Sequence, residues 1–476
     1  MKSIARLCAA TLCVIPFTGC GGGGSVSQPP PSSINVTLTP SITSLLVQTS
    51  ATFAATVTGH SNTAVTYSVM DGASGGNIHS SGLYTAPAKP GMYTVRATSV
   101  ADPSRHADAT VNVHDYKNTI ALSPRTIDGY DYHSASLLPD GSILIVGGRG
   151  YVELIHQQTL RYKPTSGSFE ADASLSTARA AHVAFSLPNG KIVVAGGYNP
   201  YSGGTAFDPV FTSSEIYDPA TKAFSPGPDM NFPRRHHVAT VLKDGRTLIT
   251  GGIQLLGSGF GASPNTEIFD PTTSGFVAAE RMNEGRWLHT ATLLKDGRVL
   301  IVGGRNNNCT SNCPIYSLNS AEIYDPSTGL YTSTGSLQIS RFSHTATLLH
   351  DGRVLILGGQ TTEDLGTGND QVGTAEVYDP ATGQFSTWTN LMVPRSNHQA
   401  VELLNNKILI MGGLRASAIG TDQTEIFDPE TGESHEGPLL NDFHAGATAT
   451  RLNNGEVFLF AGWNGAQPGI YGETFQ

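Results

Sequence analysis

Short runs of β-branched and apolar residues recur along the chain from about residue 133 onward. Residues 289–304 read HTATLLKDGRVLIVGG, and residues 344–359 read HTATLLHDGRVLILGG. In both segments, two strand-like runs flank an Asp-Gly pair, which is a hairpin signal because Gly accepts a positive φ. The pattern therefore predicts two antiparallel strands that end at a Gly-Gly pair.

This pattern repeats along the rest of the chain, with starts 49 to 55 residues apart. Its copies are 133–148, 182–197, 237–252, 289–304, 344–359, 398–413 and a degenerate one at 447–462. A second motif, written EIYDP or similarly, lies between copies at 215–219, 267–271, 322–326, 376–380 and 425–429, with a weak form at 160–164. Four short strands per repeat and a period near 50 are typical of a kelch-type β-propeller.

The last repeat lacks a fourth strand before residue 476. In the other repeats an aromatic residue of the fourth strand lies thirteen residues before the next motif His, and thirteen residues before His133 stands Ile120. We therefore expect residues 117–123 to pair into the last blade and close the ring, because closure removes open strand edges. The prediction is an all-β, seven-bladed propeller over 117–476.

Residues 34–114 alternate apolar and polar positions, with turn signals every 8–12 residues, and predict a small β-sandwich. The run GLYTAPAKPGMYTVRATS resembles bacterial immunoglobulin-like domains of surface proteins. The resemblance implies that this domain serves as a stalk.

The N-terminus is typical of an export signal. Lys2 and Arg6 precede an apolar run, Leu7 to Phe17, that is too short to span a bilayer. The following FTGC resembles a lipobox, which implies a signal peptide over 1–19, a lipidated Cys20 and an outer membrane lipoprotein, periplasmic or at the cell surface. The alternative is an ordinary signal with a chance Cys. Residues 20–33, rich in Gly and Pro, predict a tether.

The net charge of the chain indicates which classes of partner it can bind. The formal charge of −10 becomes −12 when Lys2 and Arg6 leave with the signal, and an acidic chain repels nucleic acid. No other segment predicts a membrane span, so the lipid is the expected membrane contact.

Outside the N-terminal segment only Cys309 and Cys313 remain, and export favours a local disulfide between them. A metal pair is the alternative.

Variable loops between the Gly-Gly pair and the EIYDP strand predict a recognition face. Five arginines lie three residues before a motif His: Arg179, Arg234, Arg286, Arg341 and Arg395. One interpretation is a cationic ring that binds anionic groups of a ligand, and the other is that each arginine pairs with a glutamate of its blade. The repeated His is expected to pack between strands. The acidic segment 361–370 is expected to be a solvated loop rather than a Ca²⁺ site.

Residues that break the repeat are better ligand-binding candidates, because aromatic rings facing a polar groove suit sugars or peptide side chains. These candidates are Tyr130, Tyr132, His236, Trp287, Phe342, Asn397, His444 and Trp463. The variable loops add Tyr198, Tyr201, Phe260 and Tyr316.

The propeller region resembles the central propeller of the galactose oxidase family, in which an adjacent Tyr–His pair binds copper. Here the pair would be Tyr132 and His133. The family's Tyr–Cys cross-link has no counterpart, since Cys309 and Cys313 lie in one loop. We expect a non-catalytic binding module for a glycan or protein, without a metal or cofactor. The alternative is an enzyme, either a copper oxidase or a kelch-type sugar isomerase.

Overall fold

The computed structural model describes residues 33–126, 128–151, 154–201, 209–256, 259–307, 316–361, 370–416, 419–464 and 466–476. The regular elements in these ranges are β-strands, apart from one short 3-10 turn, η1 (Gly72–Gly75). No helix in the described ranges is long and apolar enough to cross a membrane. The predictions for the signal, Cys20, Cys309 and Cys313 lie outside the described residues, as do those for the tether up to residue 32 and for residues 362–369 of the acidic segment.

The N-terminal unit contains three sheets around one apolar core that includes Phe53, Tyr84 and Val95. The largest sheet has the order β2-β9-β8-β5, and its β2–β9 pair is parallel. Its strands are β2 (Ile42–Leu46), β9 (His106–His114), β8 (Gly91–Ser99) and β5 (Val65–Val69). The smaller sheets are β1 (Asn35–Thr39) with β4 (Ala54–Thr58), and β3 (Ser50–Thr52), β7 (Leu83–Thr85) and β6 (Asn77–Ile78).

The described residues from Ile120 to Phe475 form seven further four-stranded antiparallel sheets, numbered here in chain order. Sheet 1 comprises β11 (Ser134–Leu137), β12 (Ile143–Val146), β13 (Thr159–Lys163) and β14 (Ser168–Asp172). Sheet 2 comprises β15 (Val183–Ser186), β16 (Ile192–Ala195), β17 (Ser214–Asp218) and β18 (Ala223–Pro226). Sheet 3 comprises β19 (Val238–Val241), β20 (Thr247–Thr250), β23 (Thr266–Asp270) and β24 (Gly275–Ala279).

The next three sheets have the same order of strands. Sheet 4 comprises β25 (Thr290–Leu293), β26 (Val299–Val302), β29 (Ala321–Asp325) and β30 (Leu330–Ser333). Sheet 5 comprises β31 (Thr345–Leu348), β32 (Val354–Leu357), β33 (Thr374–Asp379) and β34 (Gln384–Asn390). Sheet 6 comprises β35 (Gln399–Glu402), β36 (Ile408–Met411), β39 (Thr424–Asp428) and β40 (Glu433–Glu436).

Sheet 7 joins distant parts of the chain. It comprises β41 (Thr448–Arg451), β42 (Val457–Phe460), β43 (Gly472–Phe475) and β10 (Ile120–Leu122), and Ile120 lies opposite Phe475. The first strands of successive sheets contact one another, and β41 also contacts β11. The sheets therefore form a closed ring.

The second strand of every sheet is buried along its whole length. Such a strand packs against both neighbouring sheets, so it reads as a continuous apolar run, such as VLIV at 299–302, rather than as an alternation. The clusters between sheets are made of these strands and the aromatic residues of the third and fourth strands, such as Tyr324 and Tyr331. The repeat is therefore dictated by packing.

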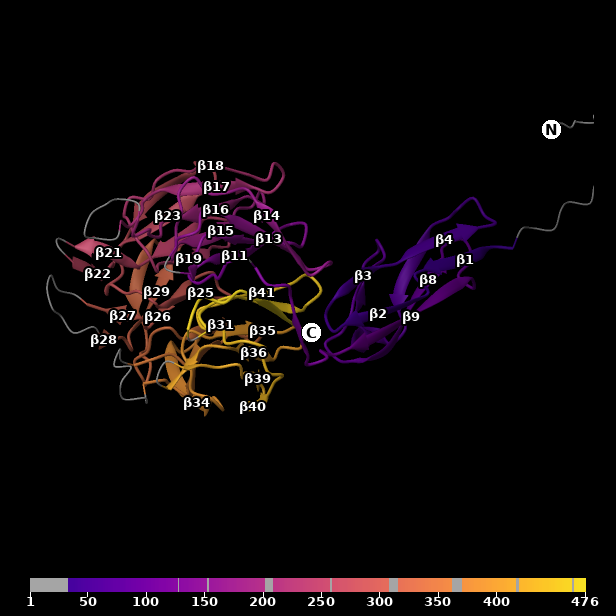
Figure 1. Cartoon of the computed structure of the whole chain (residues 1–476). Coiled ribbons are helices and arrows are strands. Elements are labelled where there is room, and N and C mark those ends of the chain that lie inside the picture. Colours follow the sequence, from indigo (N-terminus) through magenta and orange to yellow (C-terminus); the bar gives the residue numbers. More distant parts are fainter. Residues whose placement is uncertain are drawn as a thin grey trace, which may run out of the picture.

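The ring has two different ends. The Asp-Gly and Asp-Pro turns meet at one end, termed the turn face, where Asp244, Asp296 and Asp325 line one groove. The opposite end, termed the loop face, carries the short hairpins β21 (Ile253–Leu256)–β22 (Gly259–Ala262), β27 (Arg305–Asn306)–β28 (Tyr316–Ser317) and β37 (Leu414–Arg415)–β38 (Ile419–Gly420). Figure 1 shows β21, β22, β27 and β28 on the far side of the ring from the N-terminal unit.

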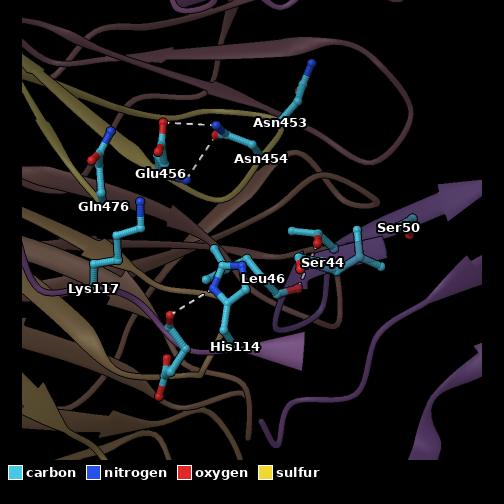
Figure 2. Close-up of a pocket in the computed structure, with 12 residues that line it drawn as sticks. Ser44, Leu46, Ser50, His114, Lys117, Asn453, Asn454, Glu456 and Gln476 are labelled. Carbon is cyan, nitrogen blue, oxygen red and sulfur yellow. Dashed lines mark hydrogen bonds between the residues drawn. The ribbon is translucent and has the colours of Figure 1, made fainter. Parts of the chain in front are cut away.

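The N-terminal unit contacts the turn face through Tyr116. The Tyr116 hydroxyl donates to the carbonyl of Gly455 (2.8 Å) and accepts from the amide of Leu404 (3.1 Å). Leu46 of β2 packs against the same turns, and a Cβ added at Gly455 would lie 2.8 Å from it. Beside this contact lies a cleft of about 470 Å³, lined from both units, in which Figure 2 labels Ser44, Leu46, Ser50, His114, Lys117, Asn453, Asn454, Glu456 and Gln476.

Candidate functional site

The five arginines that precede the motif His by three residues are structural. Each is fully buried and pairs with the glutamate of the third strand in its own sheet. Arg286, for example, donates to Glu322 Oε1 (2.9 Å) and to the carbonyl of Gly303 (2.7 Å). Glu322 in turn accepts the backbone amides of Asn283 and Glu284. The reading as a cationic ligand-binding ring is therefore wrong.

Two ligand-binding candidates occupy this same buried position, and the structure removes them from the binding face. His444 is fully buried, with Nε2 2.8 Å from Glu473 and Nδ1 2.6 Å from the Ala461 carbonyl, so it replaces the arginine of sheet 7. Tyr130 stacks on His156 at 4.5 Å in sheet 1, and burial raises its pKa to about 12. Sheet 1 has Leu160 instead of the glutamate, so the charged pair is absent there as a whole.

The motif histidines lie between neighbouring sheets. Nε2 of His344 is 2.9 Å from the hydroxyl of Thr290 in the preceding sheet, and His133, His182 and His398 have equivalent partners. Burial lowers the pKa of His133, His182, His289 and His398 to about 3, so these rings are neutral. The expectation that they pack between strands is supported by these contacts.

Residues with left-handed backbone conformation lie one position before each motif His, or before its equivalent Ala447 in sheet 7, and together they form a ring that we term the axial ring. Its members are Tyr132, Ala181, His236, Leu288, Ser343, Asn397 and Gly446, whose φ angles run from 51° to 65°. Successive members are linked by backbone hydrogen bonds, such as Ala181 N to the Tyr132 carbonyl (2.9 Å) and Asn397 N to the Ser343 carbonyl (2.9 Å). Because these bonds run from sheet to sheet, the axial ring surrounds the opening of the central axis.

A second set of pairs surrounds the axial ring. In each sheet, the residue two before the motif His forms an antiparallel bridge with the residue that follows the Gly-Gly pair or its equivalent. These pairs are Asp131–Arg149, Ala180–Tyr198, Arg235–Ile253, Trp287–Arg305, Phe342–Gln360, Ser396–Leu414 and Ala445–Trp463. The loop face thus gathers residues from two separate positions of the repeat.

Aromatic rings and guanidinium groups alternate across sheets 1 to 5 of this face, and we term the set the aromatic arc. It comprises Tyr132, Tyr198, His236, Phe260, Trp287 and Phe342, with Arg149, Arg235 and Arg305. The Arg305 guanidinium carbon lies 4.5 Å from the ring centres of both Trp287 and Phe342. His236 contacts Tyr132 and Trp287, with ring centres 5.2 and 6.0 Å apart, and burial among Arg235, Arg149 and Arg305 lowers its pKa to about 3. Arg235 lies over Tyr198 (4.4 Å) and Phe260 (4.9 Å).

Across sheets 6, 7 and 1 the same face is hollow. A pocket of about 250 Å³ is lined by Asp131, Tyr132, Arg149, Asn397, Leu414, Ala445, Gly446 and Trp463. Arg149 forms a two-pronged ion pair with Asp131 (3.0 and 2.7 Å), which raises the pKa of the guanidinium. Sheet 7 has Ala445 where sheets 4 and 5 have Trp287 and Phe342, and Gly446 where sheet 3 has His236, so smaller side chains border this space.

The remaining candidates divide between the pocket and the aromatic arc. Tyr132, Asn397 and Trp463 line the pocket, whereas His236 and Trp287 lie in the arc. Phe342 is buried, and its ring packs against the Arg305 guanidinium. Tyr201 and Tyr316 are exposed elsewhere in the loops.

The arginines of the arc, together with Asp131, were not among the predicted site residues. Arg149 and Arg305 share the position of Trp463 directly after the glycines, and Arg235 shares that of Trp287. Aligning the repeats at these two positions would have found them.

The residues do not fit the copper site that the galactose oxidase resemblance implies. His133 turns into the contact between sheets 7 and 1, where Nε2 lies 2.8 Å from the Thr448 hydroxyl, while Tyr132 faces the pocket. The two side chains of the expected pair therefore do not converge. The described residues contain no group of three His, Cys, Asp or Glu side chains that could hold a metal ion.

Comparison with protein-family models matches the kelch motif at residues 179–231 and again at residues 286–338. The chain carries kelch repeats. Spermatocyte protein spe-26 of Caenorhabditis elegans is 26% identical over 230 residues, or 47% of this chain and 38% of that protein. Galactose oxidase of Gibberella zeae is 22% identical over 255 residues, or 51% and 35%. The kelch chain therefore spans well under half the length of these relatives.

Two solved structures share the propeller-like fold. The structure of YjhT matches 66% of this chain and 99% of that chain, with a TM-score of 0.50 and 13% identity. A fungal alcohol oxidase of the AA5 family, in complex with copper, matches 75% of each chain with a TM-score of 0.56 and 15% identity. Identities this low carry the fold alone, and together with the kelch motifs they confirm the predicted kelch-repeat propeller and its all-β class.

Proposed function

We propose that this chain is an exported lipoprotein whose seven-bladed kelch propeller is a non-catalytic binding module for a glycan or a protein. The immunoglobulin-like N-terminal unit acts as a stalk, and the lipid on Cys20 is the membrane contact. The ligand binds on the loop face, over the axial ring, the aromatic arc and the adjoining pocket.

The observation that carries this proposal is the contrast between the two ends of the propeller. At the turn face, Asp-Gly-Arg turns close on themselves, as in the ion pair of Arg298 with Asp296 (2.7 Å). At the loop face, Trp287, His236 and Tyr132 remain part-exposed beside guanidinium groups. Amphipathic rings beside charged groups are the residues that dominate binding interfaces.

The contact between the N-terminal unit and the turn face also favours the loop face as the binding surface. Tyr116 and Leu46 join the N-terminal unit to the turn face, so the loop face stays uncovered by the described part of the chain. Kelch-repeat proteins commonly act as binding modules, and kelch-like protein 15 is among the relatives of this chain. Variable loops on a rigid scaffold are the usual place for recognition.

Binding of the purified protein to glycan and peptide arrays tests the proposal. We expect saturable binding that Trp287→Ala or Arg305→Ala weakens and that the turn-face control Arg298→Ala leaves unchanged. Mass spectrometry of the recovered ligand should show it unaltered. Binding lost only in the turn-face variant, or conversion of the ligand to a product, would contradict the proposal.

The lipoprotein part has a separate test. Fatty-acid labelling of the expressed protein should be lost in Cys20→Ser, and the variant should leave the membrane fraction. Equal labelling in both proteins would exclude Cys20 as the lipidated residue.

A further inference from the structure

We propose that the pocket over sheets 6, 7 and 1 holds a single pyranose unit of a neutral glycan, and that the aromatic arc continues the binding groove beyond it. This inference rests on the proposed binding function and names the class of ligand. It assigns Trp463, Tyr132 and Asn397 to the contact with that unit.

The size of the pocket limits its occupant. Its volume of about 250 Å³ is just below the range of roughly 300–1,000 Å³ typical of pockets for drug-sized ligands. A peptide helix or a strand with several side chains does not fit such a space, whereas one six-membered ring with its hydroxyl groups does.

The chemistry of the wall suits a sugar ring. Trp463 and Tyr132 supply aromatic surface, and Leu414 and Ala445 supply apolar contact for C–H groups. The Asn397 amide offers both donors and an acceptor, and the Asp131–Arg149 pair adds polar surface to the same wall. Polar groups of both kinds beside aromatic rings match a ring whose edge carries hydroxyls and whose faces carry C–H bonds.

The charge of the wall favours a neutral unit. Arg149, the guanidinium of the pocket, forms a two-pronged pair with Asp131, a side chain that is only 5% exposed. Both charged groups are therefore already engaged within the protein. An anionic sugar would compete with Asp131 for Arg149, and separating a pair this buried is costly.

The aromatic arc offers further contacts in line with the pocket. Tyr132 lines the pocket and also contacts His236, which contacts Trp287, with centroid spacings of 5.2 and 6.0 Å. The rings are inclined to one another, at 82° and 45°, so they form an uneven aromatic wall that neighbouring units of an oligosaccharide can contact. A chain is therefore expected to bind more tightly than the free monosaccharide.

Calorimetric titration of the purified full chain tests the inference, with neutral oligosaccharides of cellulose, xylan, β-1,3-glucan and starch as probes and oligogalacturonate as the anionic comparison. We expect at least one neutral probe to bind saturably, and Trp463→Ala or Asn397→Ala to weaken it about tenfold. Trp388→Ala is the matched control, because Trp388 lies on β34 beneath Arg353 (4.5 Å), away from the loop face. Thermal unfolding checks that each variant is folded.

The other outcomes separate this inference from the proposed function. Neutral binding that survives both pocket variants overturns the pocket assignment and leaves loop-face binding intact. Binding of oligogalacturonate alone, sensitive to Arg305→Ala, overturns the neutral class but supports the loop face. If none of these probes binds, the inference is wrong, and the array experiment then decides the proposed function independently.

Discussion

Removing Arg286 should destabilise the propeller far more than removing an exposed arginine of the same blade. Arg286 is fully buried and donates to Glu322, to the Ser320 hydroxyl and to the carbonyls of Gly303 and Ser320. Arg286→Met leaves the Glu322 carboxylate, itself only 3% exposed, without its cation. Breaking a buried ion pair on one side costs about 3–5 kcal/mol.

The control is Arg298→Ala. Arg298 pairs with Asp296, but their side chains are 36% and 45% exposed, and such pairs contribute about 0–1 kcal/mol. A second comparison is the double variant Arg286→Met with Glu322→Leu. Sheet 1 naturally lacks this charged pair, so we expect the double variant to recover part of the loss.

Urea unfolding followed by tryptophan fluorescence measures these differences. The three tryptophans of the chain are Trp287, Trp388 and Trp463, so the signal reports on the propeller rather than on the N-terminal unit. A loss for Arg286→Met no larger than that for Arg298→Ala would refute the reasoning that the buried pair ties each blade together.

Three further predictions follow from the packing. The buried motif histidines have pKa values near 3, well below their ordinary value, so their contribution to stability is full above about pH 6.5 and falls as pH drops, by about 1.4 kcal/mol per pH unit for each histidine. Circular dichroism should show unfolding at roughly pH 4–5, and native near-ultraviolet signal at pH 4 would contradict this. Gly304→Ala should lower the melting temperature more than Gly329→Ala: both have positive φ, but only at Gly304 does a Cβ meet atoms within 2.9 Å. Tyr116→Phe removes the partner of the buried Gly455 carbonyl, at a cost of about 1–3 kcal/mol, and that of the part-buried Leu404 amide. Faster proteolysis between the two units should reveal the loss, and an unchanged rate would argue against this contact.

Local sequence carried most of the fold. The apolar run of each second strand, the Asp-Gly turn and the Gly-Gly pair are short-range signals, and seven tandem copies of them are enough to predict an all-β propeller with kelch repeats. The signal works because each blade solves the same packing problem with the same residue types.

The residue three positions before the motif His shows why short-range sequence patterns do not identify the role of every residue. Arg286 and Glu322 are 36 residues apart, and only their contact within one blade decides that the pair is structural. His444 breaks the repeat in the sequence and therefore resembles a ligand-binding residue, yet it occupies the arginine site and holds Glu473. Tyr130 is misread in the same way, since it fills the place of a missing charge.

What the sequence by itself determined is the repeating unit: its strands, its turns and the all-β class, because these depend on residues close together in the chain. What only the tertiary structure decided is the candidate site. Asp131 and Trp463 are separated by most of the propeller, and they line one pocket because the ring brings sheets 7 and 1 together. The repeat spacing predicts that the ring closes, but which side chains meet across the closure depends on contacts between residues far apart in the chain, and the pattern of a single repeat does not contain that information.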